Sequence, residues 1–325
     1  MYLTNVKDLS RMEIVWGNDC IEAARLINPV VTIGNFDGCH RGHQEIFRRT
    51  KIHAAHIDGV SVAYTFNPHP ASVVQRNSPQ LLFSLEEKID AIRDCGLDFL
   101  VVVPFTREFA DMHPDKFVDD IILGRIRARG VVVGHNFSFG RQAMGDFVYL
   151  KSIGEKKGFF VDCVEPVIHK GMVVSSTCIR DMIRSGDVAE AAKLLPHPFR
   201  LQGTVVHGMS RGRTLGYPTA NIRPQKYLIP AYGVYAAFVY KGTERMKGVV
   251  NIGDNPTFGD EGTSIEVYIF DFKDEIYGME ITIEFIERLR GEIRFENSEH
   301  LIDQIQKDCR AAKAILSKEE GTAAF

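Results

Sequence analysis

The spacing of hydrophobic positions along the chain changes near residue 200. Before that point, short β-branched runs alternate with segments of helical spacing. The runs are 30–36, 60–66, 97–103, 131–133 and 159–164. Such alternation predicts a parallel sheet covered by helices on both faces. Ser84 and Glu87 predict a capping box at one helix start, and Pro114 predicts another start, with that helix ending at Gly130.

After residue 200, apolar and polar residues alternate along segments joined by short turns. These segments are 201–207, 233–240, 246–252, 265–272 and 279–286. This pattern predicts an antiparallel β-barrel. A last helix is predicted from a cap at Asn297 or Ser298, and its apolar stripe is expected to pack on the barrel. The stripe consists of Leu301, Ile305, Ala312 and Leu316.

An alanine-rich segment, SGDVAEAAKLLPHPF, separates the two patterns and is stopped by Pro196 and Pro198. We therefore predict a domain boundary near residue 185, with domains 1–185 and 186–325. The length of 325 residues and the hydrophobic content of 45% suit two globular domains.

The composition limits the class of partner. A formal net charge of -3 argues against a broad basic surface, so no nucleic-acid partner is expected. No apolar run approaches the ~18 residues that a membrane span needs, and the N-terminus has no signal pattern, so we expect no membrane and a cytoplasmic location. The six cysteines include no CxxC pair, which suits reduced thiols without zinc.

The first predicted strand runs into GNFDGCHRGH, residues 34–43. Gly34 and Gly38 allow backbone N–H groups to approach a ligand, and the next helix start adds unpaired donors, so phosphate is the ligand that this loop suits. His40 and His43 can each donate a hydrogen bond or a positive charge to phosphate oxygens. From the residues alone, a glycine-rich loop with two surface histidines is an equal alternative.

Other strand ends in the first half also carry polar residues, and parallel strands present their carboxyl ends at one edge. The loop TFNPHP presents Asn67 and His69, and GHNFSFG presents Asn136. Phe137 and Phe139 in the latter loop are expected to be packing residues.

A Ser/Thr cluster opens the last helical segment of the first half. Ser175, Ser176 and Thr177 precede this segment, and Arg180 lies one turn inside it. An ordinary helix N-cap explains the cluster as well as a phosphate site does, and the two roles are compatible.

In the second half, HGMSRGRTLGYPTANI makes a flexible basic loop. Pro218 then holds the chain so that Thr219 and Asn221 present oxygen atoms on one side of a strand. Oxygen donors beside a basic loop suit Mg²⁺ on ATP phosphates, although a surface turn of Gly and Arg is the alternative from the residues alone.

These motifs resemble those of a known family. The first-half motifs are similar to GxFDGxHxGH, TFxPHP, GxNFxFG and SSTxIR of prokaryotic FAD synthetases, which belong to the HxGH nucleotidyltransferases. The second-half run is similar to GRxLGxPTAN of riboflavin kinases. The resemblance covers roughly residues 15–316 and implies a bifunctional riboflavin kinase and FAD synthetase, in an α/β chain with a Rossmann-like domain, an antiparallel barrel and a C-terminal helix.

The resemblance implies that the barrel phosphorylates riboflavin to FMN with Mg-ATP, and that the first domain transfers AMP from ATP to FMN. His40, His43 and Arg180 would act on phosphates, and Glu266 would be the general base toward riboflavin. Alternation places Glu266 opposite three apolar neighbours, so a solvated strand glutamate is the alternative. Thr219 and Asn221 would hold Mg²⁺. Flavoprotein apo-enzymes would receive the FAD.

The resemblance also assigns a set of nucleotide- and flavin-binding positions. These are Gly34, Asn35, Phe36, Asp37, Gly38, Asn67, His69, Asn136, Ser175, Ser176, Thr177, Gly208, Arg213, Gly216, Pro218, Asn255 and Arg290. Asn255 lies in a segment similar to the flap over the kinase site, and Arg290 in a segment placed near the flavin edge.

Two alternatives stay open. One is a working kinase with a silent N-terminal scaffold, motivated by Asn136, where many members have Asp, and by LLPHPF, where many have LLGRPY. The other is a flavin-sensing regulator without turnover, which predicts a dispensable Glu266.

Overall fold

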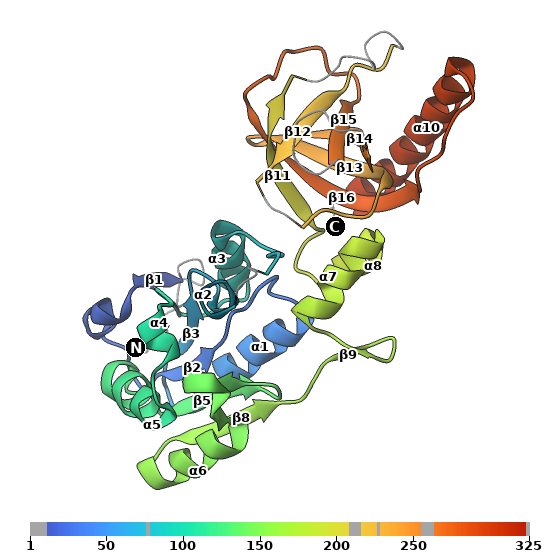
Figure 1. Ribbon diagram of the computed structural model, residues 1–325. Helices are drawn as coiled ribbons and strands as arrows, with labels where there is room; N and C mark the ends of the chain where they lie inside the picture. Colours follow the sequence, from blue (N-terminus) through green and yellow to red (C-terminus); the bar gives the residue numbers. More distant parts are fainter. Residues whose placement is uncertain (1–11, 76–78, 208–215, 226–227, 255–262, 323–325) are drawn as a thin grey trace, which may run out of the picture. The chain divides into compact units, whose positions relative to one another are not determined.

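The computed structural model describes residues 12–75, 79–207, 216–225, 228–254 and 263–322. The chain forms two compact units (Figure 1). The first unit comprises residues up to Pro79 and Phe83–Ser176, and the second comprises Gln80–Leu82 and the chain from Thr177 onward. The boundary that we predict at residue 185 falls at the last residue of α7 (Ser176–Ser185) and stays a prediction.

The first unit is built on a six-stranded parallel sheet with the order β1-β4-β3-β2-β5-β8. The strands are β1 (Glu13–Trp16), β2 (Val30–Ile33), β3 (Ser61–Phe66), β4 (Phe99–Val103), β5 (Gly130–Gly134) and β8 (Phe160–Val164). The five predicted runs are thus confirmed as strands. The sequence patterns did not indicate β1, which pairs with β4 at the edge of the sheet.

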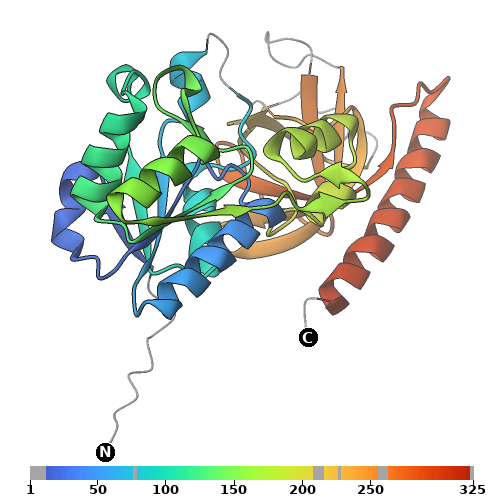
Figure 2. The same cartoon turned by 90° about the horizontal axis from the view of Figure 1, so that it is seen from below.

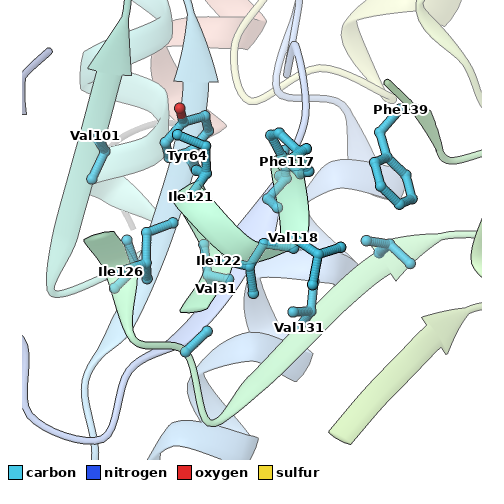
Figure 3. Packing of buried hydrophobic residues seen from close by; sticks show 14 of the residues in the cluster. Val31, Tyr64, Val101, Phe117, Val118, Ile121, Ile122, Ile126, Val131 and Phe139 are labelled. Atoms are coloured by element: carbon cyan, nitrogen blue, oxygen red, sulfur yellow. The ribbon is translucent and has the colours of Figure 1, made fainter. Parts of the chain in front are cut away.

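Helices cover both faces of this sheet, because its strands are apolar on both sides. On one face, Val30 and Val132 pack with Ala54 of α1 (Arg41–His56). On the other face, Val31 and Val131 belong to the cluster that Phe117, Val118 and Ile122 complete (Figure 3). Among the described residues, this unit also contains the helices α2 (Pro70–Val74), α3 (Leu85–Asp94), α4 (Arg107–Ala110), α5 (Pro114–Phe117), the π-helical η3 (Val118–Ile126) and α6 (Phe147–Lys157), together with the 3-10 helices η1 (Asn18–Cys20), η2 (Glu22–Ala24) and η4 (Arg141–Ala143).

The predicted helix boundaries are confirmed at one place and wrong at another. The Ser84 side chain accepts the N–H of Glu87 (3.2 Å), and Glu87 accepts the N–H of Ser84 (2.6 Å), which completes the capping box of α3. The helix that begins at Pro114 ends at Ile126 rather than at Gly130. Arg127 takes a left-handed conformation (φ 58°) that turns the chain, and Gly130 already pairs with β2 and β8.

The strand order reverses beside β2. The chain passes from β2 through β3 to β4 on one side and places β5 and β8 on the other. Loops at the carboxyl ends of β2 and β5 therefore diverge at this switch point, where open α/β sheets bind their ligands. GNFDGCHRGH and GHNFSFG supply these two loops.

The second unit contains a closed antiparallel barrel with the order β11-β12-β15-β14-β13-β16, as predicted. Its strands are β11 (Arg200–Val206), β12 (Ala220–Pro224), β13 (Gly233–Lys241), β14 (Glu244–Asp254), β15 (Thr263–Ile269) and β16 (Glu280–Arg290). The short helix α8 (Val188–Ala192) packs on β16.

Helix α10 (Ser298–Thr322) packs along the outside of the barrel (Figure 2). Asn297 Oδ1 accepts the N–H of His300 (2.9 Å) and so caps the helix. Ala312 and Leu316 are fully buried in a cluster with Phe238 and other barrel residues, whereas Leu301 and Ile305 are half-buried. The predicted packing on the barrel is confirmed for Ala312 and Leu316.

Candidate active sites

The loop after β2 is tightly coiled and contains three residues with a left-handed backbone conformation. Phe36 (φ 52°), Gly38 (φ 79°) and Cys39 (φ 41°) all lie in the left-handed region. A Cβ atom on Gly34 would lie 2.8 Å from the Phe36 ring, so the glycine makes room for that ring. Phe36 is only 2% exposed and packs on Phe47, which makes it a packing residue that shapes the loop.

The two predicted catalytic histidines lie together at the start of α1. His40 occupies the N-cap position, and its ring stacks on that of His43 with 3.6 Å between centroids. Burial, the neighbouring His40 and the Lys88 cation lower the pKa of His43 well below its usual value. His43 is therefore neutral near pH 7, so it can donate an N–H but not the positive charge that the sequence left open.

Asp37 ties this loop to two other segments of the first unit. One carboxylate oxygen accepts the N–H of Phe83 (3.2 Å), just before α3. Its backbone carbonyl accepts the Ser176 hydroxyl (2.9 Å) at the first residue of α7. The structure thus brings the beginning of the SSTCIR segment onto the loop GNFDGCHRGH (residues 34–43), which we call the signature loop.

The predicted residues after β3 and β5 occupy loop positions. His69 Nδ1 accepts the N–H of Ala71 (3.1 Å) and caps α2, while Asn67 is exposed directly after β3. Asn136 is exposed in the turn after β5. Phe137 and Phe139 stack on each other and join the core cluster, so their predicted packing role is confirmed.

The remaining predicted site residues of the first half lie at the start of α7. Ser175 precedes the helix, and Thr177 and Arg180 lie in it, within the second unit. Arg180 Nε donates to the backbone carbonyl of Gln80 (2.7 Å). This contact fixes the stem of the side chain that we predict to bind phosphate.

In the barrel, Glu266 lies in a row of polar residues. On β15 it pairs directly with Asn221 of β12 on one side and with Asn251 of β14 on the other. Directly paired residues of antiparallel strands point to the same face. The neighbours Ile265 and Val267 are buried on the opposite face, as the alternation predicted.

Thr219 completes this polar row. Its hydroxyl donates to a carboxylate oxygen of Glu266 (3.2 Å), and Asn221 is 6% exposed. Hydroxyl, amide and carboxylate oxygens form the hard donor set that Mg²⁺ prefers, so the residues present fit that ion. Gly216 and Pro218 are exposed just before β12. The predicted ligand residues Gly208, Arg213 and Asn255 lie outside the described residues.

Arg290 is occupied by a structural contact. Its guanidinium donates to Asp308 of α10 at 2.9 to 3.2 Å, and it lies 5.9 Å from the Phe295 ring. Glu292 Oε1 accepts the N–H of Asp254 (3.3 Å) at the end of β14. The flavin-edge role assigned to Arg290 stays a prediction.

The sequence analysis missed two residues at these sites. Asn251 lies beside Glu266 only through strand register, although its position in the NIGDNPTFG segment was a usable signal. Lys88 donates to the signature loop and to the end of β3, and no local pattern marks it.

Comparisons with known proteins agree with this geometry. The family model described as FAD synthetase matches residues 23–178, and the model described as riboflavin kinase matches residues 195–316. A bifunctional riboflavin kinase/FMN adenylyltransferase from Listeria monocytogenes is 39% identical, covering 90% of this chain and 94% of that protein. Proteins described in the same words from Bacillus subtilis and Escherichia coli K12 are 38% and 33% identical, covering 87% and 91% of this chain and 91% and 96% of those proteins.

One solved structure is similar over most of the chain. It is described as a macrolide-efflux protein from Streptococcus pneumoniae, with 30% identity and a TM-score of 0.81, and it covers 93% of this chain and 99% of that chain. Within the described part of this chain, no helix has the length and apolar character to cross a membrane.

A parallel-sheet unit with a histidine pair at a helix start, joined to a barrel with a carboxylate among amides, defines a two-domain nucleotide-dependent transferase. The chain belongs to the family of bifunctional riboflavin kinases/FMN adenylyltransferases.

Proposed function

We propose that the chain catalyses two consecutive reactions of flavin cofactor synthesis. The barrel unit transfers the γ-phosphoryl group of ATP to riboflavin, giving FMN and ADP. The sheet unit transfers the adenylyl group of a second ATP to FMN, giving FAD and pyrophosphate. The observation that carries the proposal is that one chain combines a histidine pair at the start of α1 with the Glu266 row of the barrel, and family models match around both.

In the kinase reaction we assign Glu266 as the general base. Its carboxylate takes the proton of the ribityl 5′-hydroxyl as that oxygen attacks the γ-phosphorus, and ADP leaves. Such a base contributes about 10²- to 10⁴-fold to the rate. The Thr219 hydroxyl, which donates to Glu266, fixes the direction of the carboxylate.

Thr219 and Asn221 would hold Mg²⁺, which when bound neutralises charge on the ATP phosphates. The hydrogen of the Thr219 hydroxyl points to Glu266, which leaves oxygen lone pairs of Thr219 available for the ion. We assign Gly208, Arg213, Gly216, Pro218 and Asn255 to the surrounding nucleotide and flavin contacts.

In the adenylyl transfer no protein nucleophile is required. An ionised phosphate oxygen of FMN attacks the α-phosphorus of ATP, and pyrophosphate leaves. Neutral His43 donates an N–H to the phosphate oxygens, together with His40 and the unpaired backbone donors at the start of α1. We assign Ser176 and Arg180 to the leaving pyrophosphate, and Asn67 and Asn136 to the nucleotide and flavin.

The test is product analysis by chromatography after incubation with riboflavin, ATP and Mg²⁺. The wild type should form FAD. A His40→Ala/His43→Ala variant should stop at FMN, and Glu266→Gln should form no product from riboflavin but should still convert added FMN to FAD. Chelation of the metal with EDTA should stop FMN formation in the wild type and in the histidine variant.

The same experiment tests the two alternatives, a kinase with a silent first unit and a flavin sensor without turnover. FMN without FAD from the wild type would mean a kinase with a silent first unit. Full activity of Glu266→Gln would contradict the assigned base, and binding of riboflavin without any product would indicate a sensor.

A further inference from the structure

Lys88 of α3 links the two loops that carry predicted adenylyltransferase residues. Its ammonium donates to the backbone carbonyl of Phe66 (3.0 Å), to the Thr65 hydroxyl (3.2 Å) and to the backbone carbonyl of Asn35 (3.4 Å). Asn35 belongs to the signature loop after β2, and Thr65 and Phe66 end β3. An ammonium has three protons, and each of them has an acceptor here.

The contacts around this ammonium reinforce one another. The Thr65 hydroxyl also donates to Asn35 O (3.2 Å), so this carbonyl accepts two hydrogen bonds. The other end of the signature loop contacts the same residue, because the Cys39 thiol lies 3.9 Å from the carbonyl oxygen of Lys88. Lys88 therefore contacts the signature loop at Asn35 and at Cys39. The capping box fixes the first turn of α3, beside which Lys88 lies.

Two pKa shifts reflect the position of the Lys88 ammonium. Burial lowers the pKa of Lys88, which identifies an ammonium withdrawn from water among backbone oxygens. Its positive charge also contributes to the lowered pKa of the neighbouring His43. The backbone N–H of Lys88 donates to the carbonyl of Ser84 (3.0 Å) within α3, whereas its side chain leaves the helix for two neighbouring strand ends.

We infer that Lys88 is a positioning residue for the adenylyl transfer: it fixes the Asn35 carbonyl against the end of β3 and so sets the loop that presents His40 and His43 to the phosphates. The inference rests on the proposed function of the first unit. Displacement of catalytic groups by about 1 Å can cost on the order of 10²-fold in rate. The effect should fall on kcat, because the loop is already folded before substrate binds.

The test compares Lys88→Met, Lys88→Arg and the matched control Lys51→Met. Lys51 of α1 donates to the carbonyl of Cys95 (2.6 Å), at the other end of α3, and makes no described contact with the signature loop. Rates of FMN adenylylation and of riboflavin phosphorylation are measured on each full-length protein. The kinase rate reports on the second unit, and fluorescence of Trp16, the single tryptophan, reports on folding of the first.

We expect kcat for adenylylation to fall about 100-fold in Lys88→Met and about tenfold in Lys88→Arg, because a planar guanidinium cannot serve three acceptors in the same geometry. In both Lys88 variants, the KM values and the kinase rate should stay within about twofold of wild type. In Lys51→Met, all rates should stay within the same range. NMR titration should show a higher pKa for His43 in Lys88→Met but not in Lys88→Arg, because only the former removes the cation.

The inference is overturned if Lys88→Met adenylylates FMN at the wild-type rate, or if Lys51→Met loses as much activity. If Lys88→Met does not fold, Lys88→Arg decides: a folded arginine variant with slowed kcat supports the inference, and one with wild-type kcat reduces Lys88 to a stability role. A wild-type protein that forms no FAD from FMN and ATP refutes the proposed function, and the inference falls with it. FAD formation at an unchanged rate in both Lys88 variants refutes the inference alone.

Discussion

His43 shows how burial selects one chemical form of a residue. A histidine at a helix start benefits little from a positive charge, since the helix N-terminus is itself positive. Stacking on His40 and enclosure by the loop remove water from the ring, and the cation of Lys88 lies nearby. The neutral ring that results can donate to a phosphate without holding it as a tight ion pair, which suits a site that must release pyrophosphate.

The lowered pKa of His43 predicts a pH dependence of stability. Below about pH 6.5 the His43 imidazole binds a proton in the unfolded state but stays neutral in the folded state. The free energy of unfolding should therefore fall on acidification from pH 7 to pH 5. The contribution is at most about 1.4 kcal/mol per pH unit. Urea unfolding followed by Trp16 fluorescence should show a weaker acid dependence in His43→Gln than in wild type. His56→Gln, a substitution at an exposed position of α1, should keep the wild-type slope. Equal slopes in all three proteins would contradict a lowered pKa of His43.

At the scale of elements, the sequence patterns were sufficient wherever a local rule operates. Apolar runs predicted five of the six strands of the parallel sheet, the Ser84 and Glu87 pair predicted the start of α3, and alternation predicted the face of Glu266. The exposed edge strand β1 and the π-helical end of the α5 segment have no such signature. Contacts between distant segments could not be predicted from the sequence either. Lys88 contacts Asn35, which lies 53 positions away in the chain, and Asn251 lies beside Glu266 only because of the strand register.

Arg290 illustrates the same limit, because its partner depends on how α10 packs. The guanidinium is 18% exposed and Asp308 is 7% exposed, and Gln304 Nε2 donates to the same carboxylate (2.8 Å). The family resemblance predicts that Arg290 lies near the flavin, whereas the structure shows it paired with Asp308, which joins α10 to the end of β16. The two uses are compatible only if the flavin meets a part of the guanidinium that Asp308 leaves accessible.

This ion pair predicts a large stability effect in the barrel. Asp308→Ala leaves a mostly buried guanidinium without its counter-charge, and such a loss costs about 3–5 kcal/mol. The expected result is earlier loss of riboflavin kinase activity on heating, because the assigned kinase residues belong to this unit. Asp303→Ala, at an exposed position of the same helix, is the matched control and should behave as wild type. Unchanged heat resistance of Asp308→Ala would show that the pair contributes little.

At the scale of the whole molecule, each unit has a hydrophobic core of its own. The first core gathers residues from Val15 to Phe159, and the cluster beneath α10 gathers residues from Val234 to Leu316. The two family models match on either side of residues 179–194. Separate cores allow a substitution to disable one reaction while the other unit stays folded.

This independence predicts complementation between two inactive proteins. Glu266→Gln forms no FMN, and His40→Ala/His43→Ala forms FMN but no FAD, so neither should convert riboflavin to FAD alone. An equimolar mixture with ATP and Mg²⁺ should form FAD, after a lag during which free FMN accumulates, because FMN has to dissociate from one chain and bind to the other. A chromatographic time course measures both the lag and the intermediate, and wild type at the same total concentration is the reference. Shortening of the lag by added FMN would confirm its cause. If the mixture forms no FAD although each variant keeps its single activity, FMN does not leave the chain that makes it, and the two units act as one enzyme.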